Sequence, residues 1–319
     1  MSLLEVSGLT KHFPVRRGML GLSEGLVRAV DSVSFTLDVG ATLGLVGESG
    51  CGKTTTSRLI LGLEPPTAGE IRFAGEDILA AQKAEARRRY RRSVQAVFQD
   101  PYASLDPRMR VGSIIAEPLV INGESDAAGR RHRVRELLDV VGLPARAADL
   151  FPHEFSGGQR QRIAIARALA LSPKLIVLDE PVSALDVSIR AQILNLLRDL
   201  QTHLGVSYLF ISHDLAAVAH MSHTIAVMYL GKLVELGDAA AIALEPKHPY
   251  TKALFAAALP IDFDTKTEEV VLSGEVPSPL NPPGGCRFHT RCPYVLPQCA
   301  IEEPPLRSES GRLVACHLY

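Results

Sequence analysis

The sequence predicts an α/β fold in which helices cover a mainly parallel sheet. Strand-like and helix-like patterns alternate through most of residues 40–230, as such a sheet requires. Short, mostly apolar runs, typical of strands buried on both faces, lie at Thr42–Val46, Leu175–Asp179 and Ser207–Ser212. After about residue 245 the composition changes, because prolines crowd residues 277–305 and four of the five cysteines appear. This last part is expected to form a small Cys-rich C-terminal extension.

The composition limits the possible functions. The chain has 319 residues, of which 46% are hydrophobic and 22% charged, as in ordinary globular proteins. Lys and Arg (34) balance Asp and Glu (35), which argues against bulk electrostatic binding to nucleic acid. The N-terminus lacks a secretory-signal pattern, and no apolar run approaches the ~18 residues that span a bilayer. We therefore expect a cytosolic protein whose thiols stay reduced and form no disulfide framework.

The first third of the chain predicts strands followed by a helix. Leu3–Val6 and Val33–Leu37 alternate apolar and polar residues, as half-buried strands do, and Arg16–Gly25 between them is expected to be a hairpin loop. After the strand Thr42–Val46, a helix should run from Lys53 to about Leu63, where two prolines end it.

The rest of the core is predicted in the same way. The basic run Arg87–Arg92 favours a solvated helix face, with a phosphate or lipid contact as the alternative. A strand is expected at Val94–Gln99, and residues 111–150 carry helical periodicity without a strong strand signal. Late strands are expected at Ile225–Leu230 and Lys232–Glu235.

A phosphate-binding loop follows the strand Thr42–Val46. Residues Gly47–Thr54 match the pattern G-x-x-x-x-G-K-[ST] at every required position, between a predicted strand and a predicted helix. Glycines let backbone N–H groups approach phosphate oxygens, and the helix adds its positive N-terminal dipole. Lys53 would contact the outer phosphates, and Thr54 would ligate Mg²⁺. The predicted ATP-binding residues of this segment are Gly47, Glu48, Ser49, Gly50, Cys51, Gly52, Lys53, Thr54 and Thr55.

A second acidic motif supports nucleotide hydrolysis. The apolar strand Leu175–Leu178 delivers Asp179 and Glu180 at its carboxyl end, where open α/β sheets bind ligands. Asp179 is expected in the Mg²⁺ shell, and Glu180 is expected to polarise the attacking water. An Asp-Glu pair after a strand can also simply begin a helix, but the phosphate loop favours the catalytic role.

The segment Glu154–Arg162, which reads EFSGGQRQR, resembles the signature motif of ATP-binding-cassette (ABC) ATPases, with Phe155 where Leu is usual. The resemblance implies a P-loop NTPase (RecA-like) core with an antiparallel β subdomain and a helical subdomain. It also implies a dimer of cassettes in which each signature motif faces the ATP of the opposite subunit. Residues implied in that contact are Ser156, Gly157, Gly158 and Gln159, together with Asp186 of the D-loop-like stretch Ser183–Asp186.

Other motif residues match the family in order. Gln99 resembles the Q-loop glutamine, which touches Mg²⁺ and water and contacts the membrane subunits. His213 resembles the switch histidine that contacts the γ-phosphate, and Phe13 is the candidate for stacking on adenine. Because no required motif residue is missing, the resemblance implies ATP hydrolysis with Mg²⁺ and not ATP binding alone, with Glu180, His213 and Gln99 as the catalytic residues.

Narrower features resemble the ATPases of oligopeptide/dipeptide importers. These features are Val97–Arg108, His248–Leu254 and the Cys-rich tail, while the loop Gly47–Lys53 and the basic segment after Phe13 resemble the F-type subunit of the pair. The resemblance implies a paired ATPase subunit, two membrane permease subunits and an extracytoplasmic peptide-binding protein. It places the chain peripherally on the cytoplasmic face of the cell (inner) membrane, held through subunits only and without direct nucleic-acid contact.

The implied organisation has four ranges. Residues 1–106 form the RecA-like core and β subdomain, and 107–165 the helical subdomain with the signature motif. Residues 166–245 complete the core, and 246–319 form the C-terminal extension.

The cysteine tail predicts a metal site. Its spacing, C-x5-C-x6-C-x16-C, is looser than that of most zinc modules. Four thiolates suit tetrahedral Zn²⁺ or an iron–sulfur cluster, and the residues alone favour zinc slightly, with free thiols as a further alternative. The family resemblance instead implies a [4Fe–4S] cluster. The predicted ligands are Cys286, Cys292, Cys299 and Cys316, with His289 and His317 as neighbouring alternatives.

Two other functions are alternatives to the peptide-importer ATPase. A soluble ABC ATPase acting on nucleic acid or the ribosome usually fuses two cassettes or carries large inserts and basic tails, and this chain has neither. A non-hydrolysing regulatory partner is disfavoured by the intact Glu180 and His213. The sequence leaves the transported solute open.

Overall fold

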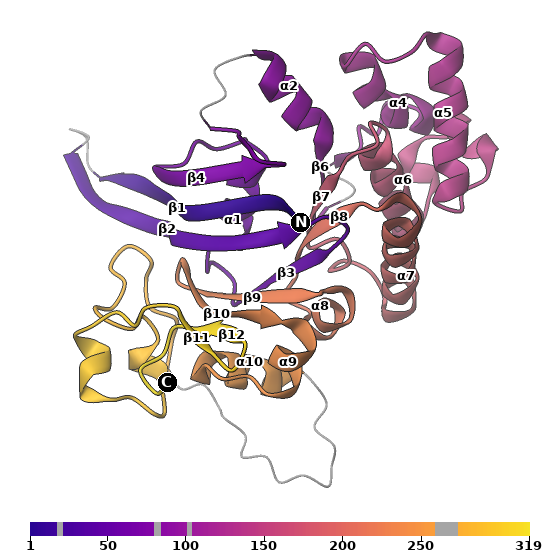
Figure 1. Cartoon of the computed structure of the whole chain (residues 1–319). Coiled ribbons are helices and arrows are strands. Elements are labelled where there is room, and N and C mark those ends of the chain that lie inside the picture. Colours follow the sequence, from indigo (N-terminus) through magenta and orange to yellow (C-terminus); the bar gives the residue numbers. More distant parts are fainter. Residues whose placement is uncertain (18–21, 80–83, 101–103, 259–273) are drawn as a thin grey trace, which may run out of the picture. The chain divides into compact units, whose positions relative to one another are not determined.

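The computed structural model describes residues 1–17, 22–79, 84–100, 104–258 and 274–319 (Figure 1). Their contacts form two compact units. Unit 1 comprises Met1, Asp38–Ala41 and Ala80–Phe210, and unit 2 comprises Ser2–Leu37, Thr42–Leu79 and Ile211–Tyr319. The four ranges expected from the sequence do not coincide with these units and stay predictions.

An antiparallel sheet opens unit 2. Its strand order is β2-β1-β4-β5, and Leu4 of β1 lies opposite Phe73 of β4. The strands are β1 (Ser2–Arg17), β2 (Leu22–Asp38), β4 (Ala68–Phe73) and β5 (Glu76–Asp77). The two predicted short strands are therefore the apolar ends of long strands, and both ends of the predicted loop Arg16–Gly25 lie within these strands. Its central residues, 18–21, lie outside the described part.

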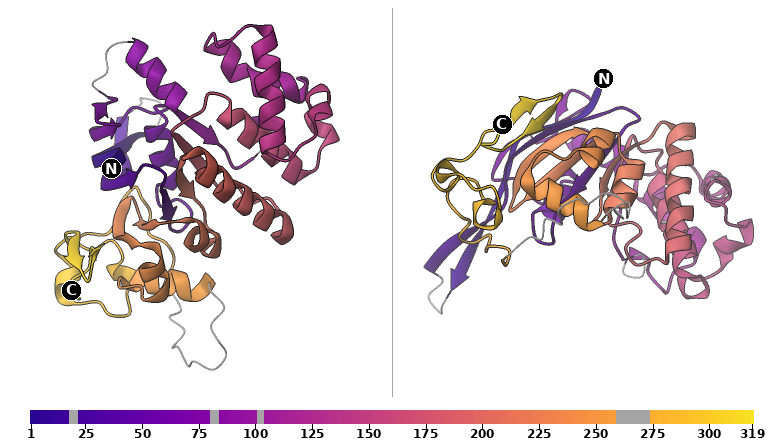
Figure 2. Two further views of the ribbon diagram at one scale, coloured as in Figure 1. Left: turned by 45° about the vertical axis from the view of Figure 1, so that its right-hand side comes forward. Right: turned by 90° about the horizontal axis from the view of Figure 1, so that it is seen from below.

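A second sheet in unit 2 carries the phosphate loop. Here β3 runs parallel to β9, β9 pairs antiparallel with β10, and β10 pairs with β12, which pairs with β11. The strands are β3 (Thr42–Val46), β9 (Thr224–Tyr229), β10 (Lys232–Asp238), β11 (Arg307–Glu309) and β12 (Arg312–Val314). The last hairpin of the tail therefore extends the sheet that bears the phosphate loop. Both views of Figure 2 show this yellow tail beside orange strands of the same unit.

The helices of unit 2 are short. They are α1 (Lys53–Ile60), α8 (Leu215–Met221), α9 (Ala239–Leu244) and α10 (Pro249–Ala258), and the tail adds 3-10 turns η3 (His289–Arg291) and η4 (Pro297–Ala300). Tyr229, Tyr250 and Phe288 form an aromatic cluster with ring centroids 4.7 to 5.5 Å apart. All three side chains are buried, so the tail shares a hydrophobic core with β9 and α10.

Unit 1 holds the strand order β8-β7-β6, with β6 parallel to β7. The strands are β6 (Val94–Val97), β7 (Leu175–Asp179) and β8 (Ser207–Ile211), and every residue of β7 and β8 is buried, as their apolar sequences predict. The helices are α2 (Ala84–Ser93), α4 (Val111–Ile121), α5 (Ala127–Val140), α6 (Gly157–Leu169) and α7 (Val187–Leu204), with 3-10 turns η1 (Ala145–Asp149) and η2 (Pro152–Glu154). The helical insert expected at residues 111–150 is confirmed.

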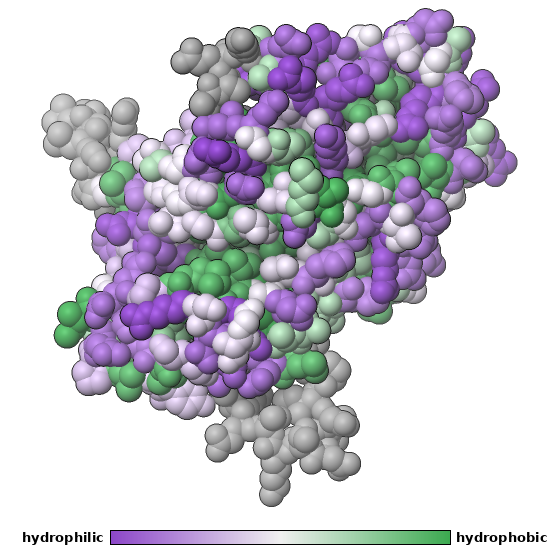
Figure 3. Space-filling model, in the orientation of Figure 1, coloured by the Kyte–Doolittle hydropathy of each residue, from purple (hydrophilic) through white to green (hydrophobic). Residues whose placement is uncertain are grey.

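The basic run lies on α2. Its arginines are exposed, while Tyr90 is buried. Figure 3 shows the corresponding hydrophilic surface over this helix. The run therefore forms a helix with an exposed basic face, and both the solvated face and a contact role stay predictions. Within the described residues, no helix is long and apolar enough to cross a membrane.

Candidate ATP-binding and hydrolysis site

The phosphate loop joins β3 to α1 and requires glycine at two positions. Gly47 has φ 149° and Gly52 has φ 112°, both in the region that favours glycine. A Cβ at Gly47 would lie 2.2 Å from the carbonyl oxygen of Met228, and one at Gly52 would lie 2.2 Å from that of Ala29. Backbone therefore packs against the loop on both sides, and a methyl group has no room.

The Lys53 side chain hydrogen-bonds to the backbone of its own loop. This side chain is buried, and Nζ donates to the carbonyl oxygens of Gly47 (2.7 Å) and Glu48 (3.0 Å). Gly52 occupies the N-cap position of α1 and offers no side-chain cap, so the first N–H groups of the helix remain open to an anion. Thr54 is exposed in the first turn. This arrangement can bind a polyphosphate and present a hydroxyl to its metal ion.

Cys51 belongs to the packing of the loop. Its side chain is 3% exposed, and burial raises the pKa of its thiol against the opposing effect of Lys53. The thiol therefore stays protonated at neutral pH, and the side chain serves the packing of the loop.

Glu48 connects the loop to distant parts of unit 2. Its backbone N–H donates to the hydroxyl of Tyr250 at 2.7 Å. Its carboxylate accepts two hydrogen bonds from Arg291, at 2.8 and 3.1 Å. Sequence reasoning did not single out Tyr250 or Arg291, because a contact across 243 residues leaves no local signal.

Two further predicted residues lie in unit 2. His213 follows β8 and is exposed, and the next residue, Asp214, caps α8 by accepting from the N–H of Ala217 at 3.0 Å. Phe13 is partly exposed on β1, and the Lys11 ammonium lies 4.8 Å from its ring centroid. The Phe13 ring forms a cation–π contact with this ammonium through its aromatic face. An aromatic face is also the kind of surface on which a nucleotide base can stack.

The acidic pair lies in unit 1. Asp179 ends β7 and is 7% exposed, while Glu180 is half-buried and has φ 51°. Its carbonyl oxygen accepts from the N–H and the hydroxyl of Ser183, at 3.4 and 3.1 Å. A non-glycine residue in the left-handed region costs energy and is held there by the surrounding structure, as is common at functional sites.

The signature motif forms a capped helix start. Ser156 accepts from the N–H of Gln159 at 3.3 Å, and Gln159 Oε1 accepts from the N–H of Ser156 at 3.0 Å. Both side chains are exposed, whereas Arg160 is buried and donates to the carbonyl oxygen of Phe155 at 2.5 Å. A Cβ at Gly158 would lie 2.4 Å from Ile189 of α7, so glycine permits this packing. The motif presents small polar groups on a rigid base.

The remaining unit 1 residues are also at the surface. Gln99 is exposed two residues beyond β6, and Asp186 is exposed at the N-cap of α7. The structure thus gathers the predicted site residues in two sets. Unit 2 holds Phe13, Gly47–Thr55, His213 and the cysteines, and unit 1 holds Gln99, Ser156–Gln159, Asp179, Glu180 and Asp186.

The predicted metal site is not supported by the geometry. Among the residues with described positions, which include all four tail cysteines, no group of three or more His, Cys, Asp or Glu is placed to hold a metal ion. Burial raises the pKa of Cys286 to about 11, and also raises the pKa of Cys292 and Cys316. The two alternative ligands face backbone, since His289 Nδ1 lies 2.8 Å from the carbonyl oxygen of Cys286 and His317 Nε2 lies 2.9 Å from that of Glu302.

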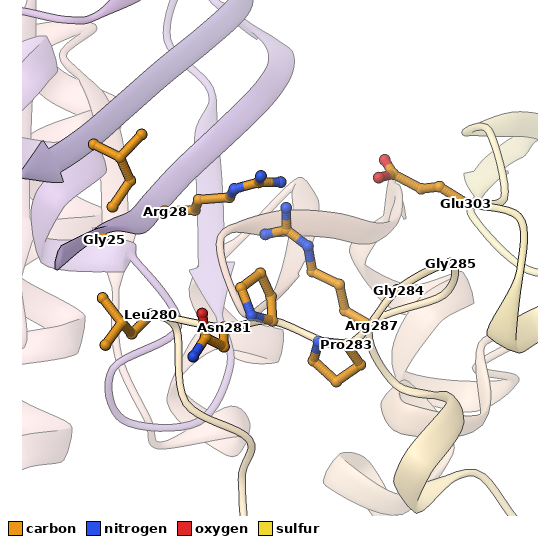
Figure 4. A pocket seen from close by; sticks show the side chains of 11 residues that line it. Gly25, Arg28, Leu280, Asn281, Pro283, Gly284, Gly285, Arg287 and Glu303 are labelled. Carbon is orange, nitrogen blue, oxygen red and sulfur yellow. The ribbon is translucent and has the colours of Figure 1, made fainter.

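A cavity of about 780 Å³ lies between the start of β2 and the tail (Figure 4). Arg28, Arg287 and Glu303 line it together with a proline- and glycine-rich stretch. Arg287 pairs with Asp31, and Glu303 pairs with Lys232 at 2.7 Å. Its charged groups therefore serve largely to join the tail to the sheets.

Two family models match the chain. The ABC transporter model matches residues 30–183, and the model of the oligopeptide/dipeptide transporter C-terminal region matches residues 234–299. The first match spans the phosphate loop, the signature motif and the acidic pair. The second spans the tail as far as Cys299.

Curated relatives match over nearly the whole chain. The dipeptide transport ATP-binding protein DppF of Escherichia coli (strain K12) is 50% identical, covering 98% of this chain and 93% of that protein. The oligopeptide transport ATP-binding protein AppF of Bacillus subtilis (strain 168) is 50% identical, covering 100% and 98%.

A solved structure agrees on the fold. The ATP-binding cassette MJ0796, in a dimeric post-hydrolysis state bound to ADP and Pi, matches with a TM-score of 0.65 and 28% identity, covering 74% of this chain and 98% of that one. The expected cassette fold and the expected ATPase class are thereby confirmed. The chain belongs to the ABC transporter family, among the ATP-binding subunits that carry the oligopeptide/dipeptide transporter C-terminal region.

Proposed function

We propose that this ABC ATPase powers the import of peptides through partner membrane subunits. The observation that carries the proposal is the tail, which shares a sheet with the phosphate loop and matches the oligopeptide/dipeptide C-terminal region. The relatives named for dipeptide and oligopeptide transport support the same substrate class, whereas the near-neutral charge disfavours the nucleic-acid alternative.

The site residues have proposed roles. Lys53 and the loop N–H groups would bind the phosphates of ATP, and Thr54, Asp179 and Gln99 are the residues proposed to hold Mg²⁺. Glu180 orients the attacking water, and His213 contacts the γ-phosphate. The exposed helix start Ser156–Gln159, with Asp186, serves the ATP of a paired subunit, since a helix N-terminus attracts anionic groups.

Partner docking is proposed on unit 1. A cavity of about 580 Å³ is lined by Arg87, Arg88 and Arg91, by the apolar Ile121 and Leu171, and by Arg167, whose charge is paired with Glu117 of the same lining at 2.7 Å. Such a surface fits an acidic, partly apolar segment of a permease subunit. Charge reversal at Arg91 should therefore abolish co-purification with the permease subunits and leave ATP binding intact. Unchanged co-purification would exclude this surface as the dock.

A metal-binding role of the tail remains a separate proposal. Backbone N–H groups face three of its thiols, those of Cys286, Cys292 and Cys316, and lower their pKa against the larger effect of burial. The N–H of Leu296 donates to the thiol of Cys299 at 3.4 Å. Such bonds stabilise thiolates, which a bound iron–sulfur cluster or zinc ion requires.

The tail proposal has its own test. Protein purified without oxygen should be brown and contain iron and labile sulfide with little zinc. Colourless protein that contains zinc would show that the tail binds zinc and not a cluster. Metal-free protein with full ATPase activity would exclude both metal assignments.

Peptide import is tested by reconstitution. The chain, its paired ATPase, the permease subunits and the binding protein are placed in liposomes, and uptake of a labelled dipeptide is followed with and without MgATP. Uptake should require ATP and fail with the Glu180→Gln variant. ATP hydrolysis that responds to ribosomes or nucleic acid, without peptide uptake, would contradict the proposal.

A further inference from the structure

Arg291 joins the Cys-rich tail directly to the phosphate loop. It ends the turn η3, immediately before Cys292, and its guanidinium forms a two-pronged ion pair with Glu48 at 2.8 and 3.1 Å. The Arg291 side chain is only 7% exposed and that of Glu48 24%, so water screens the pair weakly. The pair is therefore a strong connection and not a surface contact.

The surroundings of Arg291 hold it in this position. Its guanidinium also donates to the hydroxyl of Tyr229 at 3.4 Å, within the aromatic cluster of Tyr229, Tyr250 and Phe288. Tyr250 accepts the N–H of Glu48 at 2.7 Å. The backbone N–H of Glu48 is thus bound to this cluster directly, and its carboxylate is linked to the cluster through Arg291.

A second tail arginine reinforces the arrangement. Arg287 is buried and binds the carboxylate of Asp31 and the carbonyl oxygen of Leu230. The next residue, Gly231, donates its N–H to the carbonyl oxygen of Cys51 at 2.8 Å. The tail therefore supports the phosphate loop from two directions (Figure 4 shows Arg287).

The charge of Glu48 gives Arg291 a specific task. Glu48 lies between Gly47 and Ser49, in the segment that must receive the negative phosphates of ATP. An unpaired carboxylate there would repel the nucleotide and compete for Lys53. In the structure the buried guanidinium of Arg291 neutralises the charge of this carboxylate, and two hydrogen bonds hold the carboxylate on the arginine.

We propose that Arg291 is a positioning residue of the ATP site, through which the tail keeps the phosphate loop receptive to nucleotide by neutralising Glu48. The proposal goes beyond the peptide-import function and requires neither a peptide nor a metal in the tail.

The test compares MgATP binding by Arg291→Ala, Glu48→Gln and the double variant in the full chain, with a fluorescent ATP analogue as the probe. Arg291→Ala should raise the Kd about fivefold or more, within the usual range of coupling between sites. The double variant should bind like Glu48→Gln, because removing the stranded carboxylate removes the repulsion. Arg307→Ala, on an exposed position of β11, is the matched control and should bind like the wild type.

This design separates positioning from tail unfolding. If Arg291→Ala only unfolded the tail, the added Glu48→Gln change would not restore binding, and that result would overturn the proposal. Wild-type affinity of Arg291→Ala would also overturn it. If Arg291→Ala does not fold, Arg291→Lys keeps the charge but loses the two-pronged geometry, and it should bind ATP with intermediate affinity that Glu48→Gln again restores. A wild-type Kd of Arg291→Lys fits neutralisation by charge alone, whereas a reduced affinity that Glu48→Gln does not restore overturns the proposal.

Discussion

The phosphate loop and the Cys-rich tail belong to the same unit, but different forces hold them. The loop is fixed by backbone packing, since carbonyl oxygens of Met228 and Ala29 occupy the space that side chains at Gly47 and Gly52 would need. The tail has a small core and is fixed by charged side chains. Its anchors are the pairs Arg287–Asp31, Arg291–Glu48 and Arg312–Glu235.

The difference has practical consequences. A backbone conformation held by steric exclusion does not depend on pH or salt, but it does not accept an added methyl group. A tail held by ion pairs tolerates small steric changes but not the loss of a charge, because the remaining partner is left buried and unpaired. Variants that add volume in the loop or remove charge from the tail should therefore behave differently.

The largest expected effect is the loss of ATP hydrolysis on substitution of Glu180, which lies outside both the phosphate loop and the tail. Glu180→Gln should lower kcat by at least about 100-fold, the usual contribution of a positioned acid–base group. The Kd for ATP should stay near that of the wild type, because both the loop and its tail anchor are unchanged. Steady-state ATPase assays and equilibrium binding check this, and normal turnover would refute the role of Glu180.

The next largest effect is expected at Arg312–Glu235, the most deeply buried of the three tail ion pairs. Glu235 is fully buried, and its carboxylate accepts hydrogen bonds from the N–H groups of Lys247 and His248. The same carboxylate pairs with Arg312. The Arg312 guanidinium also donates to the carbonyl oxygens of Ala241 and Glu245. Arg312→Ala should lower the free energy of unfolding by about 3 kcal/mol or more, because it leaves a buried charge uncompensated.

The matched control for that variant is on the neighbouring strand. Arg307→Ala removes an exposed arginine and should change stability by less than about 0.5 kcal/mol. Urea unfolding measures both. Equal small effects would show that the tail does not depend on buried charge.

A methyl group in the loop gives a smaller loss of stability but abolishes nucleotide binding. Gly52→Ala combines an unfavourable φ with a backbone overlap and should cost about 2–3 kcal/mol. Gly62→Ala is the control, since Gly62 has φ 65° but open space around its Cβ position, so it should cost about 1 kcal/mol. Urea unfolding and ATP binding test the pair, and a Gly52→Ala protein that binds ATP normally would contradict steric control of the loop.

The smallest expected effect is a pH dependence of the tail. Burial alone would raise the pKa of Asp31, but the charges of Lys232 and Arg287 outweigh it, and the pKa lies below its ordinary value of 3.8. Asp31 therefore contributes stability that is present above about pH 4 and is lost as the pH falls through the lowered pKa.

That contribution is measured with Asp31→Asn. The variant should melt below the wild type at pH 7, and the gap should close as the pH falls below 4. A gap that is constant with pH would show that the charge of Asp31 does not matter.

Local signals account for what could be predicted from sequence. The strand Leu175–Asp179, the loop and the helix beginning at Lys53 lie where their apolar runs and glycines predict them. The length of β1 and β2 was missed because their outer parts carry many polar residues, which an antiparallel sheet tolerates on its open face.

Long-range contacts account for what could not be predicted. The pairing of β12 with β10 and the ion pair of Arg291 with Glu48 join residues far apart in the chain, and neither has a spacing motif. The four cysteines drew attention to the tail, but the arginines between them make its contacts. A metal site was expected from the cysteines, and the placement of their side chains does not support it.

The energetic coupling between Glu48 and Arg291 in MgATP binding tests the link between tail and loop most directly. It is obtained from the Kd values of the wild type, the two single variants and the double variant. A coupling energy of about 1 kcal/mol or more is predicted, as for residues in direct contact. Additive effects, with a coupling energy near zero, would mean that the tail is attached to the ATP site without influencing it.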